Sequence, residues 1–180
     1  MEAAAQALAS RGVATLRYQF PYMEQGRKAP SPKPVLIETV RSAVAEAARR
    51  APDLPLLAGG KSMGGRMTST AASQAPLPGV RGLAFFGFPL HAAGRPSADR
   101  GGHLASVELP MLFLQGTRDN LADLSLLEPL LLEVRPTPVL HVAKGADHGF
   151  HVLKRSGRTD DEVLAELADL VATWARGLIG

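Results

Sequence analysis

Apolar residues along this 180-residue chain recur at two spacings, one typical of helices and one typical of buried strands. Helical spacing predicts helices over three stretches: 1–11, 34–50 and 159–178. Residues 63–75, small and polar without proline, and the leucine-rich residues 121–134 are also expected to be helical. Short apolar or β-branched runs predict strands at 13–18, 54–60, 80–86, 109–114 and 137–143.

Strands that alternate with helices predict an α/β fold with a mostly parallel sheet covered on both faces, here as one domain over residues 1–180. The run 80–86 is apolar almost throughout, which is typical of a central strand buried on both sides. Thr159 and Glu162 have the spacing of a capping box at the start of the last helix. In sheets of this kind, chemistry gathers in the loops at the carboxyl ends of the strands.

A cluster of glycines around one serine follows the strand predicted at 54–60. Gly60, Ser62 and Gly64 match the G-x-S-x-G pattern, in which a serine sits in a sharp turn between a strand and a helix. Two alternatives are a glycine-rich turn with a solvated serine and a phosphate-binding loop ending in Gly60-Lys61-Ser62. The phosphate loop is disfavoured because its first glycine would fall on Pro55.

A serine nucleophile needs a base within hydrogen-bond reach and a third group that orients the base. Asp119 follows the strand 109–114 and His148 follows the next strand, which gives the order Ser, Asp, His of the α/β-hydrolase pattern. The N–H of Met63, directly after Ser62 at the helix start, is the expected oxyanion donor. The sequence therefore predicts an acyl-transfer site.

Other residues compete for these roles. Asp123 is the rival acid, and Asp119 has an alternative interpretation as the N-cap of the helix at 121–134. His91 is the main rival base, and with Phe88 it is a candidate for lining the substrate pocket from the long loop 87–102.

The remaining candidates are expected to be structural or solvated. His141 lies inside an apolar strand, whereas His103 and His151 have no strand-end position and are expected at the surface. Asp147 precedes His148 directly, so its side chain is expected to point away from the imidazole.

Five segments together resemble a family of small α/β-hydrolase-like proteins related to dienelactone hydrolases. They are RYQFPYM at 17–23, GGKSMGGR at 59–66, FPLH at 88–91, QGTRD at 115–119 and Asp147-His148. The resemblance implies Ser62 as nucleophile, Asp119 as acid and His148 as base. It supplies no substrate. The expected partner is a small-molecule acyl compound, and no metal or organic cofactor is needed.

The chain departs from this family at its beginning. Similar proteins start with an apolar strand and a His-Gly-Ala-Gly type of loop that supplies a second oxyanion donor, and neither occurs before residue 12 here. The fold is therefore expected to be shortened at its N-terminus, with Met1 as an internal methionine of a longer protein. Loss of a central strand would leave neighbouring strand edges unpaired, which favours a homodimer.

Composition narrows the function classes. The chain is 46% hydrophobic and 21% charged, with no cysteine and a net charge of +3. The lack of cysteine excludes disulfides, zinc–thiolate sites and a cysteine nucleophile, and it fits a cytoplasmic protein. Scattered arginines do not predict nucleic-acid binding, and no apolar run is long enough to predict a membrane span.

The leading interpretation is a serine hydrolase that cleaves an ester, thioester or similar acyl compound through an acyl-enzyme. A catalytically weak or inactive hydrolase-like binding module is the alternative. Nucleotide binding through Gly60-Lys61-Ser62 is a third and disfavoured interpretation.

Overall fold

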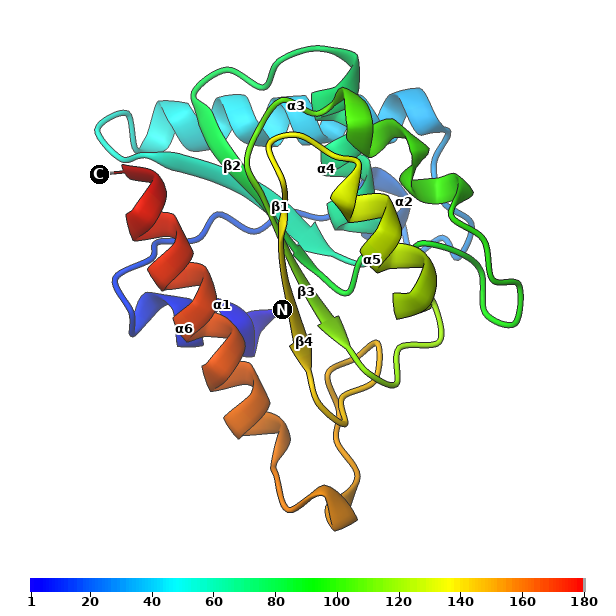
Figure 1. Ribbon diagram of the computed structural model, residues 1–180. Helices are drawn as coiled ribbons and strands as arrows, with labels where there is room; N and C mark the ends of the chain where they lie inside the picture. Colours follow the sequence, from blue (N-terminus) through cyan, green and yellow to red (C-terminus); the bar gives the residue numbers. More distant parts are fainter. Residues whose placement is uncertain (180) are drawn as a thin grey trace.

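The apolar runs form a four-stranded sheet, and the amphipathic segments form helices that pack on it (Figure 1). The computed structural model describes residues 1–179. Its elements in chain order are α1 (Glu2–Ala9), α2 (Pro21–Glu24), α3 (Lys33–Arg50), β1 (Leu56–Lys61), α4 (Met63–Gln74), β2 (Val80–Phe86), η1 (Asp99–Ser106), β3 (Met111–Gly116), α5 (Leu124–Leu132), β4 (Val139–Ala143), η2 (Lys154–Ser156) and α6 (Asp160–Ile179), with η denoting 3₁₀ helices.

The strands follow one another across the sheet in the order β1-β2-β3-β4, and all three pairings are parallel. Parallel pairing brings the carboxyl ends of all four strands to the same edge of the sheet. The predicted α/β class with a parallel sheet is therefore confirmed.

Side chains of the central strands alternate between two hydrophobic clusters, one on each face of the sheet. On one face, Leu83 and Phe85 of β2 and Met111 and Phe113 of β3 pack with residues of α3, α4 and α5. On the other face, Ala84, Phe86, Leu112 and Leu114 pack with Leu8 of α1 and the apolar side of α6. The result is the expected three layers of helix, sheet and helix.

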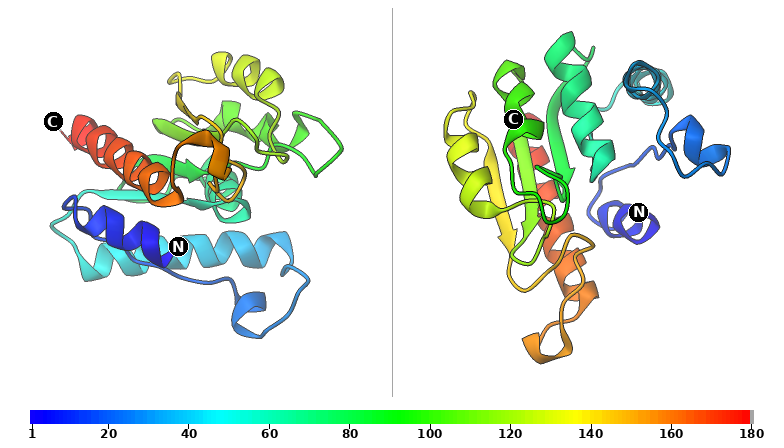
Figure 2. Two further views of the ribbon diagram at one scale, coloured as in Figure 1. Left: turned by 90° about the horizontal axis from the view of Figure 1, so that it is seen from below. Right: turned by 90° about the vertical axis from the view of Figure 1, so that its right-hand side faces the viewer.

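Helix α1 lies beside α6 on this second face (Figure 2). Their contact includes a bidentate ion pair in which Arg11 Nε and Nη2 lie 2.6 and 2.9 Å from the two carboxylate oxygens of Asp169. This pair joins the beginning of the chain to its last helix. A guanidinium–carboxylate fork fixes orientation as well as distance.

Residues 13–18 do not form the strand that their composition predicts. The segment is extended, but none of its residues from 14 to 18 makes a backbone–backbone hydrogen bond in the described part of the chain. Val13 packs in the cluster with α6, whereas Phe20 packs in the cluster with α3, so the segment crosses from one face to the other beside β1. β-propensity makes the backbone extended, but a strand also needs a partner strand within hydrogen-bond reach.

The helices differ from prediction before α3, where the short α2 forms in a stretch expected to be a loop, and in the loops after β2 and β3. Helix α5 begins at Leu124 because the Asp123 carboxylate accepts a hydrogen bond from the Ser125 N–H at 2.9 Å and so caps the helix. The long excursion after β2 contains η1, which the sequence pattern does not predict. No helix within residues 1–179 combines the length and the hydropathy that crossing a bilayer requires.

Candidate active site

Ser62 occupies a sharp turn between β1 and α4 at the carboxyl edge of the sheet. Its backbone angles are φ 53° and ψ −124°, a conformation that costs a non-glycine residue about 1–3 kcal/mol. Neighbouring glycines allow the close approach that the turn needs. A Cβ at Gly59 would lie 1.9 Å from the Ala84 carbonyl oxygen, and one at Gly65 would lie 2.7 Å from the Gly60 carbonyl oxygen. The strand, turn and helix predicted from the G-x-S-x-G pattern are therefore present.

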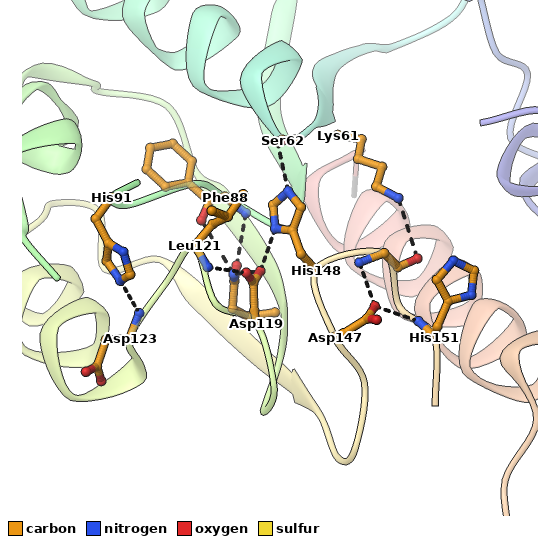
Figure 3. A network of polar contacts seen from close by, with 12 residues as sticks. Lys61, Ser62, Phe88, His91, Asp119, Leu121, Asp123, Asp147, His148 and His151 are labelled. Carbon is orange, nitrogen blue, oxygen red and sulfur yellow. Dashed lines mark hydrogen bonds and ion pairs between the residues drawn. The ribbon is translucent and has the colours of Figure 1, made fainter. Parts of the chain in front are cut away.

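Ser62, His148 and Asp119 form a continuous hydrogen-bonded chain (Figure 3). The Ser62 Oγ lies 2.8 Å from His148 Nε2, and His148 Nδ1 lies 2.8 Å from Asp119 Oδ2. The three residues come from the ends of β1, β3 and β4, so the sheet alone brings together positions that are far apart in the sequence.

The acceptors around His148 determine where its proton lies in the neutral ring. A carboxylate only accepts hydrogen bonds, so His148 Nδ1 carries the proton and donates a hydrogen bond to Asp119. This leaves the Nε2 lone pair free to accept the hydroxyl proton of Ser62. The arrangement is that of a nucleophile, a base and a group that orients the base.

Asp119 is buried, and three donors hold its carboxylate. Besides His148, the Gln115 side-chain amide donates to Oδ2 at 2.6 Å and the Leu121 N–H donates to Oδ1 at 2.8 Å. Asp119 therefore does not cap a helix, since the cap of α5 is Asp123. Sequence reasoning missed Gln115. Its signal is a single polar side chain in the otherwise apolar β3.

Hydrogen bonds that link two side chains, those of Asp147 and Lys61, to backbone groups hold the loop that carries His148. Asp147 Oδ1 accepts hydrogen bonds from the Gly149 N–H at 2.7 Å and the His151 N–H at 3.0 Å. The Asp147 carboxylate thus points away from the imidazole, as expected. Lys61 Nζ reaches the Gly149 carbonyl oxygen at 3.5 Å and so connects this loop to the end of β1 (Figure 3).

Met63 is the first residue of α4, immediately after Ser62. The first N–H groups of a helix have no acceptor within the helix. The Met63 N–H is therefore available to an external acceptor at the helix end where the dipole favours negative charge. Its use as an oxyanion donor stays a prediction.

The rival base and the rival acid bind each other and not the triad. His91 is buried, its Nε2 accepts the Asp123 N–H at 2.9 Å, and its Nδ1 lies 2.9 Å from the Ala92 carbonyl oxygen. Both ring nitrogens are thus engaged by the backbone. His91 also lines a cavity of about 370 Å³ on the Asp119 side of the triad, although neither Ser62 nor His148 is among the lining residues.

Phe88 differs from its expected position in a substrate pocket. Its side chain is fully buried and packs against Phe85 and Phe113, with ring centroids 5.6 and 5.4 Å away. Its backbone N–H donates to Gln115 Oε1 at 3.0 Å. Phe88 therefore belongs to the core behind the triad, and it supports Gln115, which in turn binds Asp119.

The other histidines lie outside this chain of contacts. His141 Nε2 lies 2.6 Å from Glu166 of α6, and the exposed His151 binds Asp160, whose hydrogen bond raises the pKa of the imidazole. His103 is not the surface residue that the sequence suggests. It is half-buried, with Nε2 2.7 Å from Ser69 Oγ, and burial together with nearby Lys33 and Arg66 lowers its pKa to about 4.

The described residues include no group of three or more histidine, aspartate or glutamate side chains that could hold a metal ion. At the carboxyl edge of the sheet, Ser62, His148 and Asp119 supply a nucleophile, a base and a group that orients the base. Such a group can attack a carbonyl carbon and transfer an acyl group.

A sequence profile described as an alpha/beta hydrolase domain matches residues 1–176 of the chain. Solved structures of similar proteins share the fold. A dienelactone hydrolase from Anabaena variabilis superposes with a TM-score of 0.73 at 20% identity, covering 98% of this chain and 78% of that one.

Two further structures are similar to the same degree. The esterase domain of a Rhodothermus marinus protein has a TM-score of 0.71 at 19% identity, and the match covers 99% of this chain and 80% of that one. An α/β serine hydrolase without a lid from Xanthomonas campestris has a TM-score of 0.72 at 22% identity, with 96% and 72% covered.

Proposed function

Because the chain belongs to the alpha/beta hydrolase domain family, we propose that it is a serine hydrolase that cleaves an ester, thioester or similar acyl compound through an acyl-enzyme. The observation that supports this function is the pair of 2.8 Å contacts that join Ser62 Oγ to His148 Nε2 and His148 Nδ1 to Asp119 Oδ2. The backbone strain at Ser62 is a second support, because such strain is typical of functional turns.

In the acylation step, Ser62 Oγ attacks the carbonyl carbon of the substrate while His148 Nε2 takes the hydroxyl proton. The carbonyl π electrons move to the oxygen, and the Met63 N–H at the start of α4 donates to that oxyanion. Asp119 stabilises the imidazolium through Nδ1. When the tetrahedral intermediate collapses, the bond to the leaving group breaks and His148 returns the proton to that group.

Deacylation repeats these steps with water. His148 Nε2 takes a proton from the water, whose oxygen attacks the acyl carbon. The second intermediate collapses by breaking the bond to Ser62 Oγ, which recovers its proton from His148. The acid product leaves, and the chain returns to its starting state with no cofactor consumed.

The function is tested by measuring hydrolysis of p-nitrophenyl acetate and butyrate, together with covalent labelling by a fluorophosphonate. Ser62→Ala should abolish labelling and turnover. The same substitution at Ser73, on the same helix but bonded only to the Thr70 carbonyl, should leave both unchanged. Labelling that persists in Ser62→Ala would mean that a different residue is the nucleophile.

The acid assignment has its own matched pair of variants. Asp119→Asn should lower kcat by about 10⁴, because an amide at this position favours the wrong histidine tautomer. Asp123→Asn removes a carboxylate that caps α5 and should change kcat little. The reverse order of effects would identify Asp123 as the acid. A folded chain that neither reacts with the fluorophosphonate nor hydrolyses either ester would favour the hydrolase-like binding module instead.

A further inference from the structure

Four basic residues lie near the contact between α4 and η1, close enough for their charges to act on one another, and we call them the cationic cluster: Lys33, Arg66, Arg100 and His103. Burial is the main cause that lowers the pKa of Arg66, and the charge of Arg100 lowers it further. Burial and the charges of Lys33 and Arg66 lower the pKa of His103. Within residues 1–179, no carboxylate forms an ion pair with any member of the cluster.

Arg66 is the member with a buried donor that has no partner, whereas Arg100 Nη1 donates to the His91 carbonyl oxygen at 3.0 Å. The Arg66 Nε is buried without a hydrogen-bond partner, and in the described chain its guanidinium makes neither a hydrogen bond nor an ion pair. Buried donors in folded proteins nearly always have an acceptor, and leaving a charged donor without one is costly. A planar guanidinium is well suited to bind a carboxylate or phosphate through two parallel hydrogen bonds.

Arg66 lies one helical turn from the nucleophile, since its N–H bonds to the Ser62 carbonyl oxygen at 3.1 Å. Side chains on a helix lean toward its N-terminus, so that of Arg66 leans toward the turn that begins at Ser62. Ser62 itself is not helical, but the hydrogen bond from the Arg66 N–H keeps its backbone within the first turn of α4. A ligand of a few bonds can thus reach both residues.

The position of His148 decides which end of a substrate faces this cluster. In Figure 3, α4 leads away from Ser62 on the side opposite His148. The leaving group must lie near His148 Nε2 because it receives its proton from that atom. The acyl chain then extends toward α4 and η1, where the cationic cluster lies.

We propose that the cationic cluster is an anion-binding subsite that takes a carboxylate or phosphate at the far end of the acyl chain, with Arg66 as its main donor. This inference rests on the proposed hydrolase function. It assigns the substrate to the class of acyl compounds that carry a negatively charged tail, such as half-esters of short dicarboxylic acids.

His103 gives the subsite a spectroscopic signal. Ser69 Oγ donates to the Arg66 carbonyl oxygen at 3.0 Å, so it accepts from the Nε2–H of His103 at 2.7 Å. The imidazole is neutral at pH 7 because burial and the cations Lys33 and Arg66 lower its pKa to about 4. A bound anion offsets that positive charge, so it should raise the pKa of His103.

The first experiment compares two substrates of equal chain length, mono-p-nitrophenyl glutarate and p-nitrophenyl pentanoate. All rates are measured above the Ser62→Ala background. The wild-type chain should prefer the anionic ester in kcat/KM, and Arg66→Gln should reduce that preference about tenfold, mainly through KM. Arg66→Lys should keep part of it. Arg81→Gln is the matched control, because Arg81 lies at the N-terminal end of β2 and the active site lies at the carboxyl ends of the strands. It should leave the preference for the anionic ester unchanged.

Equal losses for both esters, or no change in Arg66→Gln, would overturn the inference that substrate carries an anionic tail. The fold of each variant is checked by its urea unfolding midpoint, so that a misfolded protein is not mistaken for a lost contact.

The second experiment measures binding without catalysis, in the Ser62→Ala chain. Propionate and inorganic phosphate are titrated separately while the His103 ring is followed by NMR. The anion that the subsite accepts should raise the pKa of His103, and Arg66→Gln should remove the shift. The better of the two anions tells whether the tail is a carboxylate or a phosphate. No shift with either anion would overturn the subsite.

These readouts separate the two proposals. A chain with no esterase activity and no labelling, but with an Arg66-dependent shift at His103, would keep the anion site and reject the hydrolase. A chain with Ser62-dependent turnover but no shift would do the opposite.

Discussion

Gly64 and Gly65 are consecutive residues in the first turn of α4, but a side chain would clash with the packed structure at only one of them. A Cβ at Gly65 would lie 2.7 Å from the Gly60 carbonyl oxygen and 3.0 Å from Phe85 Cδ1, whereas a Cβ at Gly64 would meet nothing within 4 Å. The glycine named by the G-x-S-x-G pattern is thus not the one that lets α4 approach β1. The neighbouring glycine has that role.

This difference predicts opposite effects of the same substitution. Gly65→Ala should lower the free energy of unfolding by about 1–3 kcal/mol, because the added methyl group forces strand and helix apart. Gly64→Ala should be neutral or stabilising by up to about 1 kcal/mol, since alanine favours a helix. Urea unfolding of both variants checks the prediction. Equal destabilisation would show that the turn is tight at both positions.

His103 predicts a dependence of stability on pH. Its pKa is about 4 in the folded chain against a reference value of 6.5, so between these values the unfolded chain binds more protons. The contribution of His103 to stability is therefore present above pH 6.5 and is lost as the pH falls toward 4. Its half-exposed ring keeps the effect modest.

The matched variant is His103→Gln, which keeps a donor for Ser69 but does not titrate. Urea unfolding midpoints are measured at about pH 5 and about pH 7 for both proteins. The wild-type chain should lose more stability between these values than the variant. Parallel losses would assign the pH dependence to other groups, such as the carboxylates.

The sequence predicts residues whose position follows from chain order, and it misses those that depend on distant packing. Ser62, Asp119 and His148 each follow a strand, and parallel strands end at one edge, so their meeting could be expected. Gln115 also contacts Asp119, but its role depends on the Phe88 backbone, 27 residues away. The unpartnered Arg66 likewise becomes visible only when α3, α4 and η1 are placed together.

At the scale of elements, local signals were the most dependable. The capping box at the start of α6 is present as predicted, with the Thr159 N–H 2.7 Å from Glu162 Oε2 and the Glu162 N–H 3.2 Å from Thr159 Oγ1. It needs only residues three apart. The strand predicted at 13–18 failed because pairing is not a property of the segment itself.

Removing the cap should have a measurable cost. Thr159→Ala takes away the acceptor for the Glu162 N–H and should lower the free energy of unfolding by about 1 kcal/mol. Thr173→Ala, the same change at an exposed position inside α6, should cost little, because alanine favours helix interiors. Urea unfolding compares the two. A larger loss at Thr173 would contradict a role for the cap.

At the scale of the whole molecule, β1 and β4 are the two edge strands of the sheet that residues 1–179 form, and β1 is the one beside the extended segment 14–18. Within residues 1–179, β1 pairs with β2 alone, and all of its residues are partly exposed. Residues 14–18 run nearby without a backbone–backbone hydrogen bond in the described part of the chain, and Leu16 and Tyr18 are exposed. An uncovered edge with adjacent apolar side chains is a template for pairing with another chain.

We therefore expect a weak homodimer that forms through this edge. Sedimentation should show an average mass that rises with protein concentration. Leu16→Lys should weaken the association about tenfold, since it places like charges opposite each other in the pair. Val35→Lys changes an exposed apolar residue on α3, outside both β1 and the segment 13–18, and serves as the control. A chain that stays monomeric at all concentrations would contradict the dimer.

Because the three catalytic candidates come from separate strand ends, the reactivity of Ser62 depends on the whole sheet being folded. Ser62 and His148 are 86 residues apart, and they meet only when β1 to β4 are all in register. A partly folded chain that has lost any of these strands would contain an ordinary, unreactive serine hydroxyl. If unfolding is cooperative, loss of acylation should coincide with loss of helical circular dichroism. The reactivity of a single oxygen would then measure the fraction of intact molecules in a sample.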